Sequence, residues 1–245
     1  MNDWFAQYYA EQYADSVRGA LTPERSDKEG AFVIRQTRLQ APARILDLAC
    51  GEGRHSLAFA RRGFSVTGID RNDGWIKKAR AAAGTLDVTF IAGDMRLPVG
   101  ADYDLVACLY HSFGFFADEE NEALIRNWAA TLKPGGWFAL DVWNRDFKLV
   151  HWQPMWEWAP NAELHVREEY GFDPMTSRLA IHYTYTYANG GRYELDASHR
   201  LYTFTELRDL FARAGLVVGD VFGSLNGDSY SLESRRLVIF ARKTE

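Results

Sequence analysis

A glycine-rich turn and an acidic residue lie where strand-like segments meet helix-like segments in the first half of the chain. The apolar segment Arg44–Leu48 runs into Gly51 and Gly53, and a helical pattern follows over residues 53–62. Glycine at such a turn lets the backbone approach a ligand, and the start of a helix presents free N–H groups. Asp70 ends the next strand-like segment, where its carboxylate can accept hydrogen bonds from both hydroxyls of a ribose. The pattern predicts a site for a nucleotide-like ligand.

Two kinds of nucleotide site share this layout. A dinucleotide site expects a third glycine three residues after Gly53, but the chain has Ser56 there. Asp47, just before the turn, favours a ligand that carries a positive charge nearby. The sulfonium and amino group of S-adenosylmethionine supply such a charge, so this ligand is favoured over NAD, and a methyl-transfer enzyme over a nicotinamide-dependent oxidoreductase.

With these residues, the chain resembles the class I S-adenosylmethionine-dependent methyltransferases over most of its length. The family's motif of an acid and three alternating glycines corresponds to Asp47, Ala49, Gly51 and Gly53, with alanine in place of the first glycine. Alanine is compatible with this turn if its φ is negative, and this is the conformation we expect. The resemblance implies S-adenosyl-L-methionine as the cofactor.

The resemblance also assigns roles to residues farther along the chain. Asp70 would bind the ribose, Asp94 would accept a hydrogen bond from the adenine amino group, and the Met95 backbone N–H would reach the ring. Residues 132–136 match the turn that precedes the family's fifth strand. Other residues expected to line the cofactor site are Cys50, Arg71, Leu109 and Tyr13.

The transferred methyl group is expected between the loops that follow strands four and five, because ligands of open α/β sheets bind beyond the carboxyl ends of the strands. His111 lies in the first of these loops and is the best placed general base, since histidine titrates near neutral pH. Alternatively, it only orients the substrate or packs against the next helix. Asn144 in the second loop and Tyr9 near the N-terminus are further candidate substrate contacts.

The segment around His111 is similar to the one that small-molecule N-methyltransferases, such as the glycine enzyme, carry at this point. Enzymes that methylate nucleic-acid bases typically have an Asn/Asp-Pro-Pro-aromatic motif there, which this chain lacks. The net charge of −5 and the isoelectric point of about 5.7 also disfavour a nucleic-acid partner. We therefore predict methyl transfer to N or O of a small molecule. The alternative is a protein that binds S-adenosylmethionine without catalysis.

The hydrophobic pattern predicts an α/β fold in which strands alternate with helices, and the resemblance implies a Rossmann-like, seven-stranded methyltransferase sheet. We expect N-terminal cap helices over residues 1–40, a cofactor-binding core over 41–146, an antiparallel β insertion over 147–201, and a closing helix and strand pair over 202–245. The second cap helix begins at the capping box Ser26-x-x-Glu29, or earlier, at Pro23. Asp118 is expected to cap a later helix, and residues 133–136 to form a turn.

Aromatic residues make up 14% of the chain, and two groups of them invite a functional interpretation. The N-terminal tyrosines form either a lid over the cofactor or the packed face of an amphipathic helix. The insertion has a tyrosine face, and Trp152, Trp156 and Trp158 precede it. These aromatics line a substrate pocket, form the surface of a homodimer, or are the packed face of a sheet.

The remaining expectations concern location and other ligands. No segment approaches the ~18 apolar residues of a membrane-spanning helix. The two cysteines form no disulfide framework, and no signal peptide is recognised, so the cytoplasm is the expected location. The histidines are dispersed, and no metal site is expected.

Overall fold

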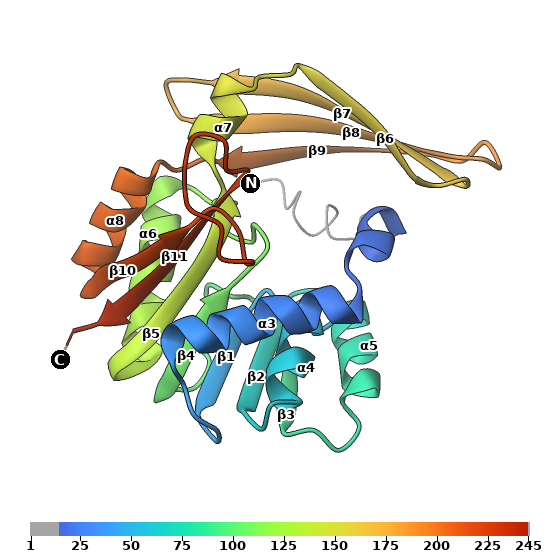
Figure 1. The fold of residues 1–245 in the computed structure, drawn as a ribbon. Coiled ribbons are helices and arrows are strands. Elements are labelled where there is room, and N and C mark those ends of the chain that lie inside the picture. Colours follow the sequence, from blue (N-terminus) through green and yellow to red (C-terminus); the bar gives the residue numbers. More distant parts are fainter. Residues whose placement is uncertain (1–14, 245) are drawn as a thin grey trace.

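The computed structural model describes residues 15–244 of the 245-residue chain, and these residues form two sheets and the helices around them (Figure 1). Tyr9 and Tyr13, which the sequence suggested as substrate and cofactor contacts, lie outside the described residues. None of the described helices is long and apolar enough to cross a membrane. The helical elements are η1 (Arg18–Ala20), α3 (Pro23–Thr37), α4 (Arg54–Ala60), α5 (Asp73–Ala83), α6 (Asp118–Thr131), α7 (Arg145–Val150) and α8 (Phe204–Arg213).

The main sheet has seven strands in the order β10-β11-β5-β4-β1-β2-β3. Neighbouring pairs within β5-β4-β1-β2-β3 are parallel, whereas β11 runs antiparallel to both β5 and β10. This order confirms the predicted Rossmann-like methyltransferase fold and the closing strand pair. The strands are β1 (Arg44–Leu48), β2 (Ser65–Asp70), β3 (Val88–Ala92), β4 (Tyr103–Cys108), β5 (Leu132–Trp143), β10 (Leu216–Phe222) and β11 (Arg236–Lys243).

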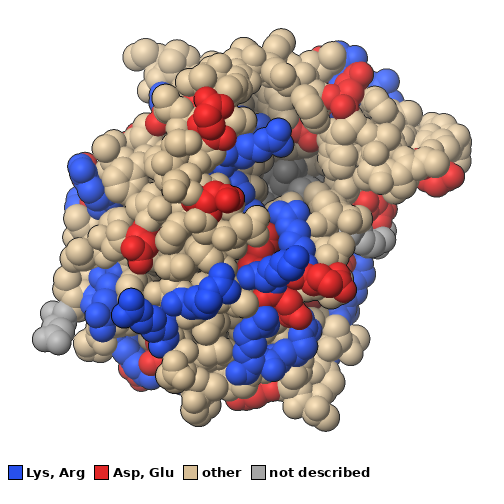
Figure 2. Space-filling model, in the orientation of Figure 1, with Lys and Arg blue, Asp and Glu red and all other residues tan. Residues whose placement is uncertain are grey.

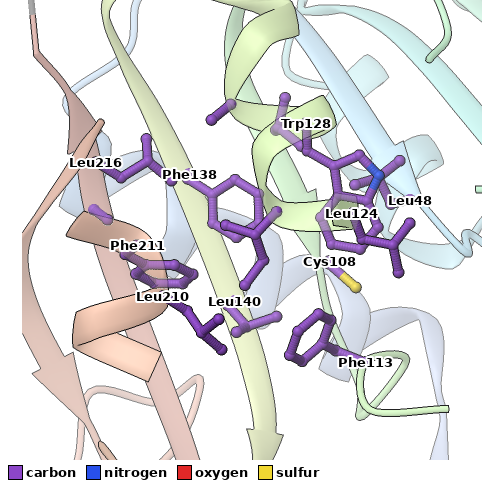
Figure 3. Close-up of a cluster of buried hydrophobic side chains, with 14 of the residues drawn as sticks. Leu48, Cys108, Phe113, Leu124, Trp128, Phe138, Leu140, Leu210, Phe211 and Leu216 are labelled. Carbon is purple, nitrogen blue, oxygen red and sulfur yellow. The ribbon is translucent and has the colours of Figure 1, made fainter. Parts of the chain in front are cut away.

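Helices cover both faces of the main sheet, which explains why its central strands are apolar throughout. On one face, α6 and α8 bury a cluster in which the Trp128 ring stacks on Phe138 with centroids 5.9 Å apart (Figure 3). On the other face, Phe32 and Val33 of α3 pack with Phe59 of α4 against the same strands. The two clusters fix the strand ends from which the functional residues project.

The insertion is a four-stranded antiparallel sheet in the order β6-β7-β8-β9, and it lies over one end of the main sheet (Figure 1). Its alternating apolar face, with Ile181, Tyr183 and Tyr185 at its centre, is buried, which agrees with one of the three interpretations of these tyrosines, the packed face of a sheet. Trp143 at the carboxyl end of β5 packs against it. The small sheet is thus held above the edge where the cofactor and acceptor loops emerge. Its strands are β6 (Met155–Asn161), β7 (Leu164–Asp173), β8 (Arg178–Tyr187) and β9 (Arg192–Arg200).

Hydrogen bonds tie the insertion to the loop that follows β4. The Arg200 N–H donates to the Gly114 carbonyl over 2.7 Å, and the Arg178 guanidinium donates to the Phe116 carbonyl. Gly114 has a φ of 98°, and a Cβ there would collide with the Arg200 carbonyl. Only glycine fits where these two backbone segments meet, so this contact fastens the insertion to the loop that carries His111.

The structure decides between some local alternatives and corrects other local predictions. Helix α3 begins at Pro23 with Thr22 as its N-cap, the earlier of the two starts considered, so Ser26 and Glu29 form no capping box. Helix α6 begins at Asp118 itself, and Ala117 occupies the N-cap position. Residues 133–136 lie within β5, but the register with β4 jumps from Tyr103 opposite Leu132 to Leu105 opposite Trp137, so the predicted turn is a bulge inside the strand. Strand β6 and helix α7 were not predicted at all.

Candidate functional site

The turn after β1 is built from left-handed residues at alternating positions. Ala49, Gly51 and Gly53 have φ values of 53°, 59° and 82°. The Cys50 N–H donates to the Ile69 carbonyl over 2.9 Å, so the turn is fastened to the end of β2. No other residue type fits at Gly53, because a Cβ there would lie 2.6 Å from the Phe90 ring.

Ala49 corrects a specific expectation. We expected a negative φ, but its φ of 53° is the left-handed conformation that glycine adopts at this position of the motif. An L-residue in this region is disfavoured by ~1–2 kcal/mol, because its Cβ crowds the neighbouring carbonyl oxygen. The turn therefore keeps its geometry at a local energetic cost. Ala49 also lines a groove beside the turn, which two adjoining cavities form.

Asp70 is held by the turn on one side and by the start of α5 on the other. One carboxylate oxygen accepts from the Gly51 N–H over 2.9 Å, and the other accepts from the Asn72 N–H over 2.8 Å. Burial raises the pKa of Asp70 above its ordinary value, while these hydrogen bonds act in the opposite direction. The carboxylate is thus fixed at the groove wall, with lone pairs left for ligand hydroxyls.

Asp47 lies under the turn and is almost fully buried. Burial raises the pKa of its carboxyl group to about 6, although the hydroxyl of Ser56 donates a hydrogen bond to it over 2.5 Å. Ser56 thus occupies the position of the third glycine in the dinucleotide motif, and its hydroxyl hydrogen-bonds the buried carboxyl group of Asp47. A cation beside Asp47 would favour its ionised form.

The far end of the groove contains the predicted adenine-contacting residues. Asp94 and Met95 line it together with Arg71, Phe115 and Phe116. The Arg96 guanidinium contacts both oxygens of Asp94, and this pairing lowers the pKa of that carboxyl group. Asp94 is thus ionised, and Arg96 already takes up part of its hydrogen-bonding capacity before any ligand is bound.

Two adjoining cavities form the groove, and they share Ala49, Trp75 and Ser112. The first contains Asp70 and Asp94, and the second contains Asp47, the glycine turn, Leu109 and Arg54. All of the predicted cofactor residues in the described part of the chain lie along this groove, apart from Gly53, whose role is to let the backbone pass Phe90. Fixed acids at two points and a turn without bulky side chains fit an adenosyl ligand with a cationic tail.

The loop after β4 places two consecutive residues in the left-handed region. Tyr110 and His111 have φ values of 64° and 66°. Such strain persists only where surrounding contacts impose it, and it concentrates at functional sites. Here Asp141 imposes it: its carboxylate accepts from the Tyr110 N–H over 2.8 Å, and its backbone carbonyl accepts from the His111 N–H over 2.9 Å.

Arg236 of β11 holds Asp141 in turn. Its Nε lies 2.7 Å from one carboxylate oxygen of Asp141, and a terminal nitrogen contacts the other oxygen. Asp141 is fully buried, so without this bidentate pair its charge would have no cationic partner among the described residues. The strand that closes the sheet therefore sets the position of the acceptor loop.

His111 lies beyond the groove, in a larger cavity under the insertion. Its ring packs between Tyr110 and Trp143, with both centroid distances at 5.2 Å. Its Nδ1 is buried and has no hydrogen-bond partner among the described residues. Burial and the nearby Arg236 hold the pKa of His111 well below its ordinary value, so the ring is neutral at neutral pH.

Asn144 is used within the protein itself. Its amide nitrogen donates to the carbonyls of Ser231 and Ser234, and its oxygen accepts from Asp146 N–H and Tyr230 hydroxyl. The residue is 1% exposed and caps α7. It anchors the loop between β10 and β11 and is not among the residues that line the acceptor cavity.

Sequence reasoning missed a buried cluster of charged residues beside the loop that carries Tyr110. Glu29 of α3 contacts Arg25 over 3.0 Å, Arg54 over 2.5 Å and His55 over 2.8 Å. Burial alone would raise the pKa of Glu29, but His55 and Arg54 hold it well below the ordinary value. Burial lowers the pKa of His55 to about 4, so it is a neutral partner at neutral pH. The one available signal, Glu29 three residues after Ser26, was interpreted as a capping box.

Arginines of this cluster surround Tyr110. The guanidinium carbons of Arg54, Arg236 and Arg25 lie 4.8, 5.2 and 5.7 Å from its ring centroid. Tyr110 also lines both the groove and the cavity under the insertion. It therefore marks the junction at which a ligand in one cavity meets a ligand in the other.

Comparisons with known proteins agree with this geometry. A family profile described as "Methyltransferase domain" matches residues 45–136. Glycine N-methyltransferase of Rattus norvegicus is 29% identical over 168 residues, which are 59% of this chain and 57% of the relative, so the match spans little more than half of that protein. The cypemycin N-terminal methyltransferase of a Streptomyces species is 30% identical over 207 residues, 80% of this chain and 81% of the relative.

A solved structure extends the likeness over nearly the whole chain. An amino pentose methyltransferase from Micromonospora echinaspora, determined with S-adenosylmethionine bound, superposes with a TM-score of 0.72 at 25% identity and covers 95% of this chain and 96% of its own. The sheet order, the groove with its two fixed acids and the sequence likeness to methyltransferases agree. The chain belongs to the class I S-adenosylmethionine-dependent methyltransferases.

Proposed function

We propose that this protein transfers a methyl group from S-adenosylmethionine to an amine nitrogen of a small molecule. The observation that carries the proposal is the meeting of two cavities at Tyr110: the groove with Asp47 and Asp70, and a separate cavity of about 620 Å³ under the insertion. A volume of this size suits a small-molecule acceptor. The rat relative is named for N-methylation of glycine and the Streptomyces relative for N-terminal methylation, which favours nitrogen over oxygen.

We assign the cofactor contacts as follows. Asp70 binds the ribose hydroxyls, and Asp94 with the Met95 backbone contacts the adenine. Asp47 stabilises the cationic end of the ligand through its negative charge. The residues that line the groove around these contacts are Ala49, Cys50, Gly51, Arg71 and Leu109.

The bound cofactor supplies a methyl group already activated by a sulfonium leaving group, so the protein's task is alignment. A nucleophile held about 3 Å from its target in line with the leaving group gains most of the available rate enhancement. The strained Tyr110–His111 segment, fixed by Asp141 and Arg236, is a rigid wall for this purpose.

We infer that His111 is a positioning residue rather than the general base. A ring whose pKa lies well below 6.5 is a weak proton acceptor, although it accepts hydrogen bonds. His111→Asn should lower kcat/KM by about tenfold without changing the shape of the pH–rate profile, which should follow ionisation of the amine. Loss of an ionisation from the profile would instead establish His111 as the base.

The test of the function itself is a transfer assay with methyl-labelled S-adenosylmethionine and two sets of small acceptors, amines and matched alcohols. We expect labelled N-methyl product and S-adenosylhomocysteine in equal amounts. Tight cofactor binding without transfer to any acceptor would favour the non-catalytic alternative, and O-methylation alone would move the acceptor atom from nitrogen to oxygen. Calorimetric titration with NAD in the same preparation should show no binding.

A further inference from the structure

The acceptor cavity differs from the cofactor groove in the charge of its walls. Its lining contains four basic side chains and one acidic side chain: Arg25, Lys148, Arg235, Arg236 and Glu168. Figure 2 shows lysine and arginine side chains gathered beside the hollow between the small sheet and the rest of the molecule. The groove, in contrast, presents its acids Asp47, Asp70 and Asp94.

Lys148 is the most informative of these cations. Its ammonium lies 5.0 Å from the centroid of Trp143 and 4.7 Å from that of Tyr170, and no hydrogen bond or ion pair to it occurs among residues 15–244. Burial lowers the pKa of Lys148 below its ordinary value, the negative charge of Glu168 acts in the opposite direction, and the nearby Arg235 lowers the pKa further. Among the described residues this largely enclosed ammonium contacts two aromatic faces but forms no ion pair, although such groups normally have one.

The neighbouring groups compensate this charge only in part. Glu168 attracts the ammonium through its negative charge but makes no ion pair with it, and its two oxygens accept hydrogen bonds from Trp158 Nε1 over 3.0 Å and from the Tyr170 hydroxyl. Arg235 makes no ion pair within the described part of the chain; its guanidinium carbon lies 6.0 Å from the centroid of Phe147. Two cations that repel each other thus face the same cavity.

The deeper ion cluster does not compensate for this excess. Glu29 and Asp141 are occupied by Arg25, Arg54 and Arg236. The buried His199 and His55 add no charge at neutral pH, since burial lowers the pKa of His199 to about 3 and that of His55 to about 4. The cavity lining and this cluster together contain the basic residues Arg25, Arg54, Lys148, Arg235 and Arg236 and the acids Glu29, Asp141 and Glu168. Glu233 is exposed and pairs with His151.

Aromatic rings form much of the remaining wall. Phe147, Trp152, Trp156 and Trp158 line the cavity with Tyr170, and they come from α7, the following loop and the insertion. This cavity combines flat apolar faces with Lys148 and Arg235, which form no ion pair among the described residues, so it suits a ligand that has an apolar body and an anionic group. A single small amino acid would leave most of the 620 Å³ unfilled.

From these observations we propose that the acceptor is an amine that carries an oxyanion, a carboxylate or a phosphate ester, bound by Lys148 and Arg235 while its amine reaches the Tyr110 junction. The proposal rests on the methyl-transfer function above and adds the charge of the substrate to it. The oxyanion provides the missing partner for Lys148, and the aromatic wall contacts the body between the two charged ends.

The test uses matched acceptors that differ only in the anionic group. Phenylalanine is compared with phenylalaninamide, and phosphoethanolamine with ethanolamine, in wild type, Lys148→Met, Lys148→Arg and a surface control, Lys77→Met, which removes an exposed lysine of α5 paired with Asp73. Wild type and the control should prefer the anionic member of at least one pair by tenfold or more in kcat/KM. Lys148→Met should reduce that preference to threefold or less, mainly through KM, and Lys148→Arg should keep it.

Binding is measured in parallel, so that this inference and the proposed function fail separately. Calorimetry follows each acceptor added to the protein saturated with S-adenosylhomocysteine, and cofactor affinity in Lys148→Met should match wild type. Which pair shows the preference identifies the oxyanion as carboxylate or phosphate. Equal binding of charged and neutral members, or a preference that survives in Lys148→Met, would overturn the inference. Selective binding without any transfer would leave it standing and overturn the proposed function.

Discussion

The cofactor groove and the acceptor cavity meet at Tyr110 but are built in different ways. The groove is formed mainly by consecutive strand–turn–helix units, and its key contacts, such as Asp70 with Gly51, join residues close in sequence. The acceptor cavity depends on pairs such as Arg236 with Asp141, which are 95 residues apart, and on side chains from the insertion. Breaking a long-range pair of the acceptor cavity should therefore cost more stability than changing a single contact of the groove.

The largest effect is expected at Arg236. Arg236→Met leaves Asp141 buried without its cationic partner, and breaking such a pair costs ~3–5 kcal/mol in the free energy of unfolding. Denaturant unfolding of the variant measures this loss. Arg236→Lys keeps the charge but not the bidentate geometry, so it should be intermediate. If Arg236→Met were as stable as wild type, the Asp141 contact would not fix the acceptor loop as we describe.

The second largest effect is expected on cofactor affinity. Asp70→Ala removes a carboxylate that we expect to accept from two ribose hydroxyls, and hydrogen bonds to charged groups contribute ~1.5–3 kcal/mol each. Calorimetry should show at least a 100-fold weaker affinity for both S-adenosylmethionine and S-adenosylhomocysteine, since ~1.4 kcal/mol is tenfold. Asp70→Asn, which keeps one acceptor oxygen, should lose less. An unchanged affinity in Asp70→Ala would refute the site assignment.

A smaller effect should appear in the pH dependence of binding. Burial raises the pKa of Asp47 from 3.8 to about 6, so the folded protein keeps a proton there that the unfolded chain loses between pH 4 and 6. This group therefore stabilises the fold at pH 4, and that contribution is lost as the pH rises through 6. A cationic ligand favours the ionised form, so affinity for S-adenosylmethionine should rise about tenfold between pH 5 and 7.

Asp47→Asn is the control for this dependence. It keeps an oxygen that can accept the Ser56 hydrogen bond and cannot ionise, so its affinity should be nearly flat over the same pH range. Relative to wild type, its free energy of unfolding should also improve between pH 4 and 7, by up to ~3 kcal/mol. A wild-type affinity that stays constant from pH 5 to 7 would mean that Asp47 is already ionised before the ligand binds.

The difference between the two regions also explains what could be predicted from the sequence. Alternation of strands and helices and the glycine turn are local patterns, and they predicted residues that the structure brings together along one groove. Strand β6 was missed because most of its side chains are exposed, with Trp156 49% accessible, so it has no alternating apolar face. The cluster of Glu29, Arg54 and Arg236 was missed because no local pattern records contacts between α3, α4 and β11.

Asn144 and Ala49 show two further limits of sequence reasoning. A loop position after a parallel strand predicts proximity to the ligand, but it does not say where the side chain points, and Asn144 is turned toward the loop between β10 and β11. The motif predicts a turn at Ala49, but the residue type gave no sign that the left-handed conformation would be kept without glycine. Tertiary hydrogen bonds from Cys50 to β2 outweigh that local preference.

The smallest predicted effect concerns this same residue. Ala49→Gly should relieve the left-handed strain and raise the free energy of unfolding by up to ~1 kcal/mol, the net of strain relief and the extra freedom that glycine gives the unfolded chain. Gly51→Ala is a matched reverse change: its φ is 59°, and a Cβ there would meet only the Trp75 ring, at 3.7 Å. It should lose about what Ala49→Gly gains. Denaturant unfolding of both variants checks the pair; a less stable Ala49→Gly would show that contacts of the alanine methyl group outweigh the strain of its backbone.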